Sequence, residues 1–203
     1  AIIHCAAMVK MIEHEKEPIK AIDANIIGTC NLIKEILGLE ETENKKVRFI
    51  YISTDGVYPG TRGNYFERDI TIPYNKYGWE KLAGECIVNL LSNFCIIRTS
   101  FFEPLNIKHE SAATDKYSSR VPIDYLPKAI AFLLTNDFVG TVNIGGARKS
   151  DYELYKKFKP SLKPTTYEEI VRGLPIRLAR DASLNSFLWQ QLKKKGKDLN
   201  LDE

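Results

Sequence analysis

Three short, continuous apolar runs constrain the fold of this 203-residue chain more than any other feature. They occupy residues 1–5, 47–52 and 94–98, and segments with helical periodicity separate them. A strand that is apolar at nearly every position is buried on both faces, and its alternation with helices is typical of a parallel sheet between two helical layers. The sequence therefore predicts an α/β protein with a partial Rossmann-like, doubly wound parallel sheet.

Two helices are expected between these strands. The first is expected to run from Pro18 to Gly38, because apolar residues recur every three or four positions and proline and glycine suit the two ends. A charged loop is expected over residues 40–46, and the second helix from Asn75 to Leu91. The buried face of the second helix is expected to carry three apolar side chains, Leu82, Cys86 and Leu90.

Small, hydroxyl-bearing or charged residues follow each predicted strand. They are Ala6 and Ala7 after the first strand, Ser53, Thr54 and Asp55 after the second, and Arg98, Thr99 and Ser100 at the end of the third. Right-handed crossovers bring the ends of parallel strands to one edge of the sheet, where α/β proteins bind their ligands. A site is therefore expected at this edge, although residues of these types also suit tight turns.

Tyr77 and Lys81 are four residues apart on the second helix and share one of its faces. An ammonium group there can lower the pKa of the phenol, which would suit Tyr77 to acid–base chemistry. The same spacing recurs in two later pairs, Tyr152/Lys156 and Tyr155/Lys159. Of the three pairs, only Tyr77/Lys81 follows a strand that ends in polar residues. Its position in the chain, and not its spacing, therefore identifies it as the candidate catalytic pair.

The chain after Pro104 is expected to be organised differently. Residues 106–119 are polar and aperiodic, which predicts a mobile or substrate-binding loop. The elements expected beyond it are a helix over 125–134, a strand over 140–146, and short helices over 150–157, 166–173 and 185–195. The apolar face of the last helix is expected to consist of Phe187, Leu188 and Leu192.

Composition and charge exclude several classes of protein. The net charge is +3 and the one dense basic run is Lys193–Lys195, so we expect no nucleic-acid partner. The four cysteines have no metal-type spacing and apolar neighbours, which predicts buried free thiols, a reducing compartment and no metal. No apolar run approaches about 20 residues and no signal peptide is visible, so we expect a cytoplasmic protein with no membrane partner.

Five segments carry a resemblance to a known family. In chain order they are His4–Ala7, Asn25–Leu32, Ile52–Gly60, Pro73–Glu85 and Arg98–Ser100. Together they make the chain similar to the extended short-chain dehydrogenases/reductases, and within them to the dTDP-4-dehydrorhamnose reductase group. The residues after position 100 match more loosely.

The resemblance implies NAD(P)-dependent reduction of a nucleotide-linked 4-keto-6-deoxy sugar, with NADP or NAD as the hydride-carrying cofactor. In that family pattern Thr54 would bind the substrate carbonyl and Tyr77 would supply the proton. Lys81 would lower the pKa of Tyr77 and hold the nicotinamide ribose, and Asn25 would organise the site.

The resemblance also implies two sets of binding residues. The cofactor would contact Ala6, Ala7, Ser53, Tyr77, Lys81, Arg98, Thr99 and Ser100. The nucleotide-sugar substrate would contact Thr54, Asp55, Val57, Tyr58, Tyr77 and Phe101. A homodimer is compatible with this pattern.

The chain departs from the family at its start. The family opens with a strand and a glycine-rich G-x-x-G-x-x-G turn that binds the pyrophosphate, and this sequence has no such turn. It begins inside a strand without methionine, so we expect further residues upstream. Residues 1–104 are expected to form the C-terminal part of an NAD(P)-binding domain and residues 105–203 a substrate-binding portion. Residues 120–146 are a candidate for a return to the sheet.

Two other functions stay open at this point. One is a non-catalytic regulatory subunit on the same fold, similar to that of methionine adenosyltransferase. The other is a sugar-nucleotide epimerase or dehydratase. A dehydratase is the less favoured, because Gly56 follows Asp55 where a glutamate would be expected.

Overall fold

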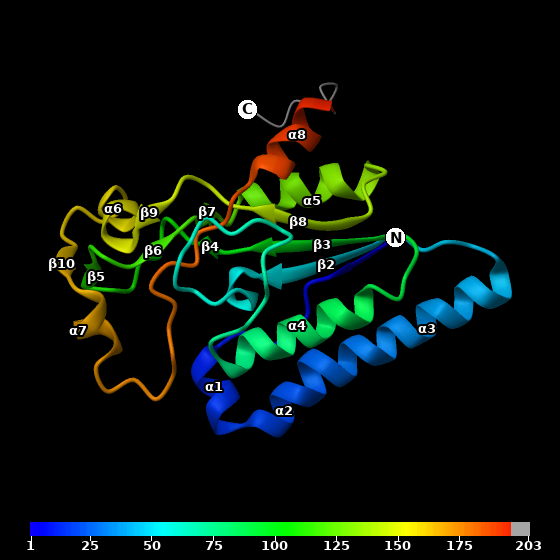
Figure 1. Cartoon of the computed structure of the whole chain (residues 1–203), viewed down its shortest axis with the longest axis horizontal. Helices are drawn as coiled ribbons and strands as arrows, with labels where there is room; N and C mark the ends of the chain where they lie inside the picture. Colours follow the sequence, from blue (N-terminus) through cyan, green and yellow to red (C-terminus); the bar gives the residue numbers. More distant parts are fainter. Residues whose placement is uncertain (196–203) are drawn as a thin grey trace.

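The computed structural model describes residues 1–195, and the centre of this part of the chain is a four-stranded parallel sheet (Figure 1). In spatial order its strands are β1 (Ile2–His4), β2 (Phe49–Thr54), β3 (Phe94–Thr99) and β8 (Gly140–Ile144). All three neighbouring pairs are parallel. The predicted parallel α/β sheet is confirmed, and the strand expected over 140–146 lies beside β3.

Helices cover both faces of this sheet (Figure 1). The helices α3 (Gly28–Glu43) and α4 (Lys76–Val88) pack on one face, and α5 (Tyr125–Thr135) and α8 (Phe187–Lys195) pack on the other. Along β2, Phe49 and Tyr51 face the first layer and Ile50 faces the second, as the two-residue period of a strand requires. The sheet is therefore doubly wound.

Short elements form a small mixed portion beyond the carboxyl ends of the sheet strands (Figure 1). Its strand pairs are β4 (Phe101–Phe102) with β7 (Val121–Pro122), β5 (Ser111–Ala113) with β10 (Lys163–Thr165), and β6 (Tyr117–Ser118) with β9 (Lys149–Ser150). Its helices are α6 (Asp151–Lys156) and α7 (Tyr167–Val171), each opened by a capping box. The segment 106–119, expected to be an aperiodic loop, thus contains both β5 and β6.

The first long helical segment differs from the expectation. It consists of α2 (Pro18–Ile22), a π-helix η1 (Asp23–Ile27) and α3, which passes Gly38 and ends at Glu43 before the left-handed Asn44. The charged residues expected in a loop are largely helical, because glutamate favours a helix. A further helix, α1 (Met11–Lys16), was not predicted at all.

The buried face of α4 was predicted wrongly. Cys86 and Leu90 are exposed and Leu82 is only partly buried. The buried positions are instead Gly78, Glu80, Lys81, Gly84, Glu85 and Val88. The glycines let the helix backbone approach the sheet closely, and charged side chains with partners fill the space between the glycines.

Two smaller expectations were also wrong. In α8 the buried residue is Trp189, whereas Phe187 is exposed and Leu188 and Leu192 pack at the edge of the core. Cys95 is a buried free thiol as expected, but Cys5 is exposed, like Cys86. Apolar neighbours in sequence therefore did not decide the burial of these thiols.

Gly78 in α4 and Gly38 in α3 differ in the space that surrounds them, and this difference leads to a prediction. A Cβ at Gly78 would collide with the carbonyl oxygen of Gly56, whereas a Cβ at Gly38 would meet nothing within 4 Å. Gly78→Ala should destabilise the fold by about 1–3 kcal/mol. Gly38→Ala should stabilise it by about 1 kcal/mol, because alanine is the better helix former. Urea unfolding of both variants measures the difference, and equal effects would contradict the close approach of α4 to Gly56.

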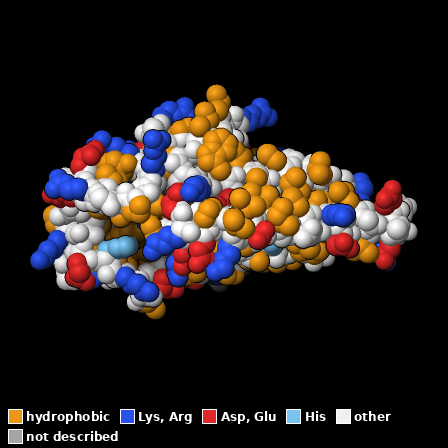
Figure 2. Space-filling view, turned by 90° about the horizontal axis from the view of Figure 1, so that it is seen from below, with side chains coloured by type: hydrophobic (Ala, Val, Ile, Leu, Met, Phe, Trp, Pro, Cys, Tyr) orange, Lys and Arg blue, Asp and Glu red, His pale blue; other side chains and the backbone are white. Residues whose placement is uncertain are grey.

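Figure 2 views the molecule from the side on which α1 to α4 lie, and apolar side chains gather there. Exposed members from α2, η1 and α4 include Ile19, Ile22, Ile27 and Trp79, and Leu90 lies just after α4. Within residues 1–195, no helix is long and apolar enough to cross a membrane. The same described residues contain no group of three or more His, Cys, Asp or Glu side chains placed to hold a metal ion.

Candidate active site

A cavity of about 810 Å³ lies at the carboxyl edge of the sheet and extends under the small C-terminal portion. The expected site residues that line it are Ala7, Ser53, Thr54, Asp55, Tyr77, Lys81, Thr99, Ser100 and Phe101. The expected residues outside its lining are Ala6, Asn25, Val57, Tyr58 and Arg98. The ends of β2 and β3 therefore meet the start of α4 around one space.

Thr54 and Asp55 form the tip of β2 inside the cavity. The Thr54 hydroxyl accepts a hydrogen bond from the backbone N–H of Gly56 and donates one to Asp55 Oδ1, both at 3.1 Å, and so caps the short 3-10 helix η2 (Asp55–Val57). Burial raises the pKa of Asp55, although Arg120 and the Thr54 hydroxyl oppose that shift. Thr54 thus caps a turn and also faces the cavity.

Tyr77 lies in the first turn of α4. The Asn75 side chain caps this helix by accepting the Gly78 N–H at 2.9 Å. Burial, followed by the Asp55 charge, raises the pKa of Tyr77 to about 12, while interaction with the Thr54 hydroxyl acts in the opposite direction. The expectation that the pKa of this phenol would be lowered is wrong for this structure.

The ammonium of Lys81 has a different partner from the expected one. Its Nζ lies 4.0 Å from the centroid of the Tyr51 ring, a cation–π arrangement. Burial lowers the pKa of Lys81 to about 8, although Glu85 and Cys5 oppose the shift. Lys81 is only 3% exposed, so its charge is held in a poorly solvated place at the cavity wall.

This burial predicts that Lys81 destabilises the protein at neutral pH. The pKa in the folded state is about 8, below the ordinary value of 10.5. The ammonium is therefore charged in both states below about pH 8, where the penalty is fully present, and the penalty fades as the pH rises toward 10.5. The difference between the two pKa values corresponds to at most about 3 kcal/mol.

Lys81→Met should therefore raise the free energy of unfolding at pH 7, by up to about 3 kcal/mol, and the gain should shrink near pH 10. Urea unfolding at both pH values measures it. Lys34→Met on the exposed side of α3 is the control and should change stability by less than about 0.5 kcal/mol. A loss of stability in Lys81→Met at pH 7 would show that the Tyr51 contact outweighs desolvation.

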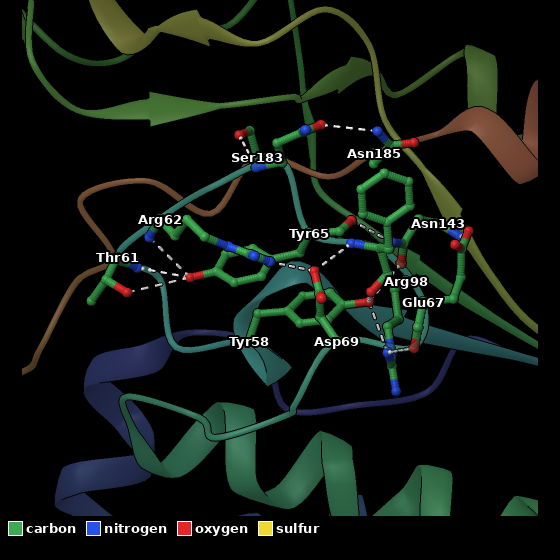
Figure 3. Close-up of polar contacts among 12 residues, drawn as sticks. Tyr58, Thr61, Arg62, Tyr65, Glu67, Asp69, Arg98, Asn143, Ser183 and Asn185 are labelled. Carbon is green, nitrogen blue, oxygen red and sulfur yellow. Dashed lines mark hydrogen bonds and ion pairs between the residues drawn. The ribbon is translucent and has the colours of Figure 1, made fainter.

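Arg98 and Tyr58 do not line the cavity, and Figure 3 shows their side chains joined by a hydrogen bond. Arg98 Nη1 donates to the Tyr58 hydroxyl at 2.8 Å, and that hydroxyl donates to Asn143 Oδ1 at 3.1 Å. The Tyr58 ring stacks on the Tyr65 ring with centroids 4.7 Å apart. These contacts of Arg98 and Tyr58 hold the end of β3 against the loop after β2. Val57 is likewise fully buried in the core.

Asn25 lies in the π-helix η1, also outside the cavity lining. Its Oδ1 accepts the Met8 N–H at 2.8 Å and its Nδ2 donates to the Met8 carbonyl at 3.1 Å. The side chain therefore holds the segment that follows Ala6 and Ala7, which accounts for a polar residue inside a helix.

The residues of the opposite wall were not among the predicted site residues, although the segment 106–119, which supplies part of this wall, was expected to be a mobile or substrate-binding loop. The polar and charged members of this wall include His109, Lys116, Arg120, Asp151 and Tyr155. Lys116 Nζ lies 2.9 Å from Asp151 Oδ2. Although burial opposes it, Arg120 and Lys116 hold the pKa of Asp151 below its usual range. The one sequence signal for this wall is the capping box at Ser150, which fixes Asp151 at the start of α6.

The doubly wound sheet and the Thr54, Tyr77 and Lys81 side chains around one cavity at its carboxyl edge define a Rossmann-like protein of the short-chain dehydrogenase/reductase type. The family model of the RmlD substrate binding domain matches residues 1–103. The chain belongs to this family.

Solved structures support the same assignment. A hypothetical dTDP-4-dehydrorhamnose reductase from Sulfolobus tokodaii is 30% identical with a TM-score of 0.79, and the match covers 100% of this chain and 74% of that one. The dTDP-4-dehydrorhamnose reductase of Bacillus anthracis, solved in complex with NADP, is 26% identical with a TM-score of 0.80, over 94% of this chain and 73% of that one.

Curated relatives are matched over smaller parts. Methionine adenosyltransferase 2 subunit beta from Pongo abelii is 32% identical over 139 residues, which cover 60% of this chain. UDP-glucose 4-epimerase from Mycoplasma genitalium is 33% identical over 95 residues, which cover 45% of it. The chain spans 40% of the former relative and 27% of the latter.

Proposed function

We propose that this chain carries the proton-transfer and substrate-binding part of an NAD(P)-dependent oxidoreductase that reduces a nucleotide-linked 4-keto-6-deoxy sugar. The observation that carries the proposal is the presence of Thr54, Tyr77 and Lys81 in the lining of one cavity at the carboxyl edge of the sheet. The names of the reductases of Sulfolobus tokodaii and Bacillus anthracis point to the same chemistry.

In this proposal the Thr54 hydroxyl holds the substrate carbonyl and Tyr77 delivers a proton to its oxygen. A donor must be protonated at the working pH, and the raised pKa of Tyr77, about 12, keeps its phenol protonated near neutrality. Lys81 holds the nicotinamide ribose, and Asn25 fixes the backbone that follows β1. The cavity positions of Asp55 and Phe101 suit contacts with the sugar, whereas Val57 and Tyr58 would act by supporting this wall.

The reduced form of NADP or NAD would supply the hydride when bound. The residues present fit the nicotinamide half of such a cofactor, because small or short side chains at Ala7, Thr99 and Ser100 leave room in the cavity beside Lys81. Ala6, Ser53 and the backbone near Arg98 adjoin the same strand ends. The sequence contains no glycine-rich turn for the pyrophosphate, so the fit extends to the nicotinamide end alone.

Several coarser features accompany the proposal. We assign residues 1–104 to the cofactor-binding domain and residues 105–203 to the substrate-binding portion, with the segment 120–146 contributing to the sheet. The exposed apolar face over α2, η1 and α4 would suit a homodimer (Figure 2). A cytoplasmic location would suit free thiols such as Cys95.

The test is a reduction assay on the protein expressed from its complete reading frame. The protein is incubated with dTDP-4-dehydrorhamnose and either NADPH or NADH, and loss of the reduced nicotinamide absorbance is followed together with the sugar product. Cofactor oxidation coupled to formation of the 4-hydroxy sugar supports the proposal. No oxidation of either cofactor with this substrate or its UDP-linked counterpart would refute it.

The match to methionine adenosyltransferase 2 subunit beta favours one alternative, a regulatory subunit that binds an enzyme. Co-purification of a stoichiometric methionine adenosyltransferase, with no sugar turnover, would support that alternative. The match to UDP-glucose 4-epimerase leaves epimerisation as another, which would change the sugar without net consumption of the cofactor.

A further inference from the structure

A buried polar cluster lies directly behind Tyr77 and takes one residue from each of three helices. His14 comes from α1, Asn25 from η1 and Glu80 from α4. Glu80 Oε2 is the shared acceptor, at 2.8 Å from His14 Nδ1 and 2.7 Å from Asn25 Nδ2. The His14 ring meets the Tyr77 ring edge-on, with centroids 5.1 Å apart and planes at 64°.

The burial of this cluster costs more folding free energy than a contact between the same helices made from apolar residues would. His14 is completely buried, and its Nε2 has no hydrogen-bond partner among the residues that the structure describes. An unsatisfied buried nitrogen costs about 1–3 kcal/mol. Glu80 is a buried carboxylate, and replacement of a buried polar pair as a whole by apolar side chains of similar size often leaves stability unchanged or higher. Packing alone therefore does not explain these two residues.

The position of Glu80 on α4 connects the cluster to the proposed chemistry. Tyr77, Glu80 and Lys81 lie in adjacent turns of one helix, and Glu80 and Lys81 are both on its buried side. The Glu80 charge is one of the groups that raise the pKa of Tyr77, after burial and Asp55. The carboxylate thus influences Tyr77 through space, and its place is fixed by His14 and Asn25.

We propose that His14 and Glu80 are positioning residues for Tyr77: the Nδ1–H of His14 holds the Glu80 carboxylate behind the phenol, and the His14 ring packed edge-on against the phenol keeps Tyr77 oriented as the donor. This role rests on the proposed reductase function. It adds α1, a helix with no residue in the expected catalytic set, to the elements that shape the site.

The first test observes Tyr77 directly and needs no turnover. The protein is labelled with ¹³Cζ-tyrosine, its Tyr77 signal is assigned as the one missing from Tyr77→Phe, and the pH at which that signal begins to move is measured. Besides His14 and Glu80, the titratable groups that interact with Tyr77 are Tyr51, Asp55 and Tyr74, and Lys81 lies one turn away. All of them are unchanged in Glu80→Gln, which keeps the size of the side chain and removes its charge.

Glu80→Gln should lower the onset of the Tyr77 titration by about 1 pH unit. Glu15→Gln is the matched control, because Glu15 pairs with Lys76 at the outer end of the same two helices, and it should leave the onset unchanged. An unmoved onset in Glu80→Gln would overturn the proposal.

The second test separates the hydrogen bond of His14 from its bulk. His14→Phe keeps a ring against Tyr77 but has no donor for Glu80, and should lower kcat by about 10–100-fold with KM changed less than about twofold. In His14→Asn the amide nitrogen takes the place of Nδ1, so most of kcat should return. Equal kcat in His14→Phe and the unchanged protein would overturn the positioning role.

The two tests also distinguish this inference from the proposed function. If the unchanged protein reduces no sugar but Glu80→Gln still shifts the Tyr77 titration, the proposed function fails and the coupling between Glu80 and Tyr77 stands. If His14→Phe fails to fold, the Glu80→Gln titration alone decides the proposal.

Discussion

Tyr77→Phe is expected to lower kcat for sugar reduction by at least about 100-fold while the protein stays folded. The substitution removes one hydroxyl and keeps the ring that packs against His14. In the proposed reaction this hydroxyl delivers the proton to the carbonyl oxygen, and the Thr54 hydroxyl beside it is already engaged, because it donates to Asp55 and caps η2. The loss should appear in kcat, measured with saturating substrate and cofactor.

The chain offers a matched control for this experiment. Tyr152 also has a lysine four residues later, and its ring lies 5.6 Å from Lys156 Nζ, but it packs in the small C-terminal portion and does not line the cavity. Tyr152→Phe should leave kcat within about twofold of its original value. Retention of activity in Tyr77→Phe, or an equal loss in both variants, would reject Tyr77 as the proton donor.

Glu85→Ala is expected to destabilise the fold by about 3–5 kcal/mol. Glu85 is 3% exposed and accepts hydrogen bonds from Arg98 Nε at 3.0 Å and Nη2 at 2.6 Å, and also from the Ser53 hydroxyl. Its removal would leave the Arg98 guanidinium buried without its counter-charge. Such an orphaned charge costs more than the ion pair contributes when intact.

Equilibrium urea unfolding near neutral pH measures this effect. Glu17→Ala is the control, since the Glu17–Lys20 pair is exposed on the surface, and it should change stability by less than about 1 kcal/mol. If Glu85→Ala costs less than about 1 kcal/mol, water must reach Arg98, and the Glu85–Arg98 ion pair does not stabilise the part of the fold that lies behind the site.

The sheet could be predicted from the sequence because its strands are buried on both faces. Residues such as Phe49, Ile50 and Tyr51 are all apolar, and a run of this kind has few alternatives once helices flank it. The residues at the strand ends followed from topology alone, since parallel strands deliver Thr54 and Thr99 to the same edge.

The buried face of α4 could not be predicted in this way. Apolar periodicity identifies a helix face that packs against a hydrophobic core. Here the face carries Glu80, Lys81 and Glu85, whose burial is possible because each has a charged or aromatic partner from a distant element. The partners are His14, Tyr51 and Arg98, and no pattern local to α4 reveals them.

The residues of the opposite wall of the cavity could not be predicted from the sequence for another reason. It is built from strands as short as Tyr117–Ser118, which are too brief to show a two-residue period. Their positions come from long-range contacts such as the one between Lys116 and Asp151.

The loop after β2 has a consequence for how the molecule is made. Its Asn64 and Tyr65 N–H groups bond to Ser183, and the Asn185 N–H bonds to the Tyr65 carbonyl. A nascent chain on the ribosome therefore cannot secure this loop against Ser183 until more than a hundred further residues have emerged. Such late closure slows folding and extends the time during which chaperones or proteases can reach the unfinished site.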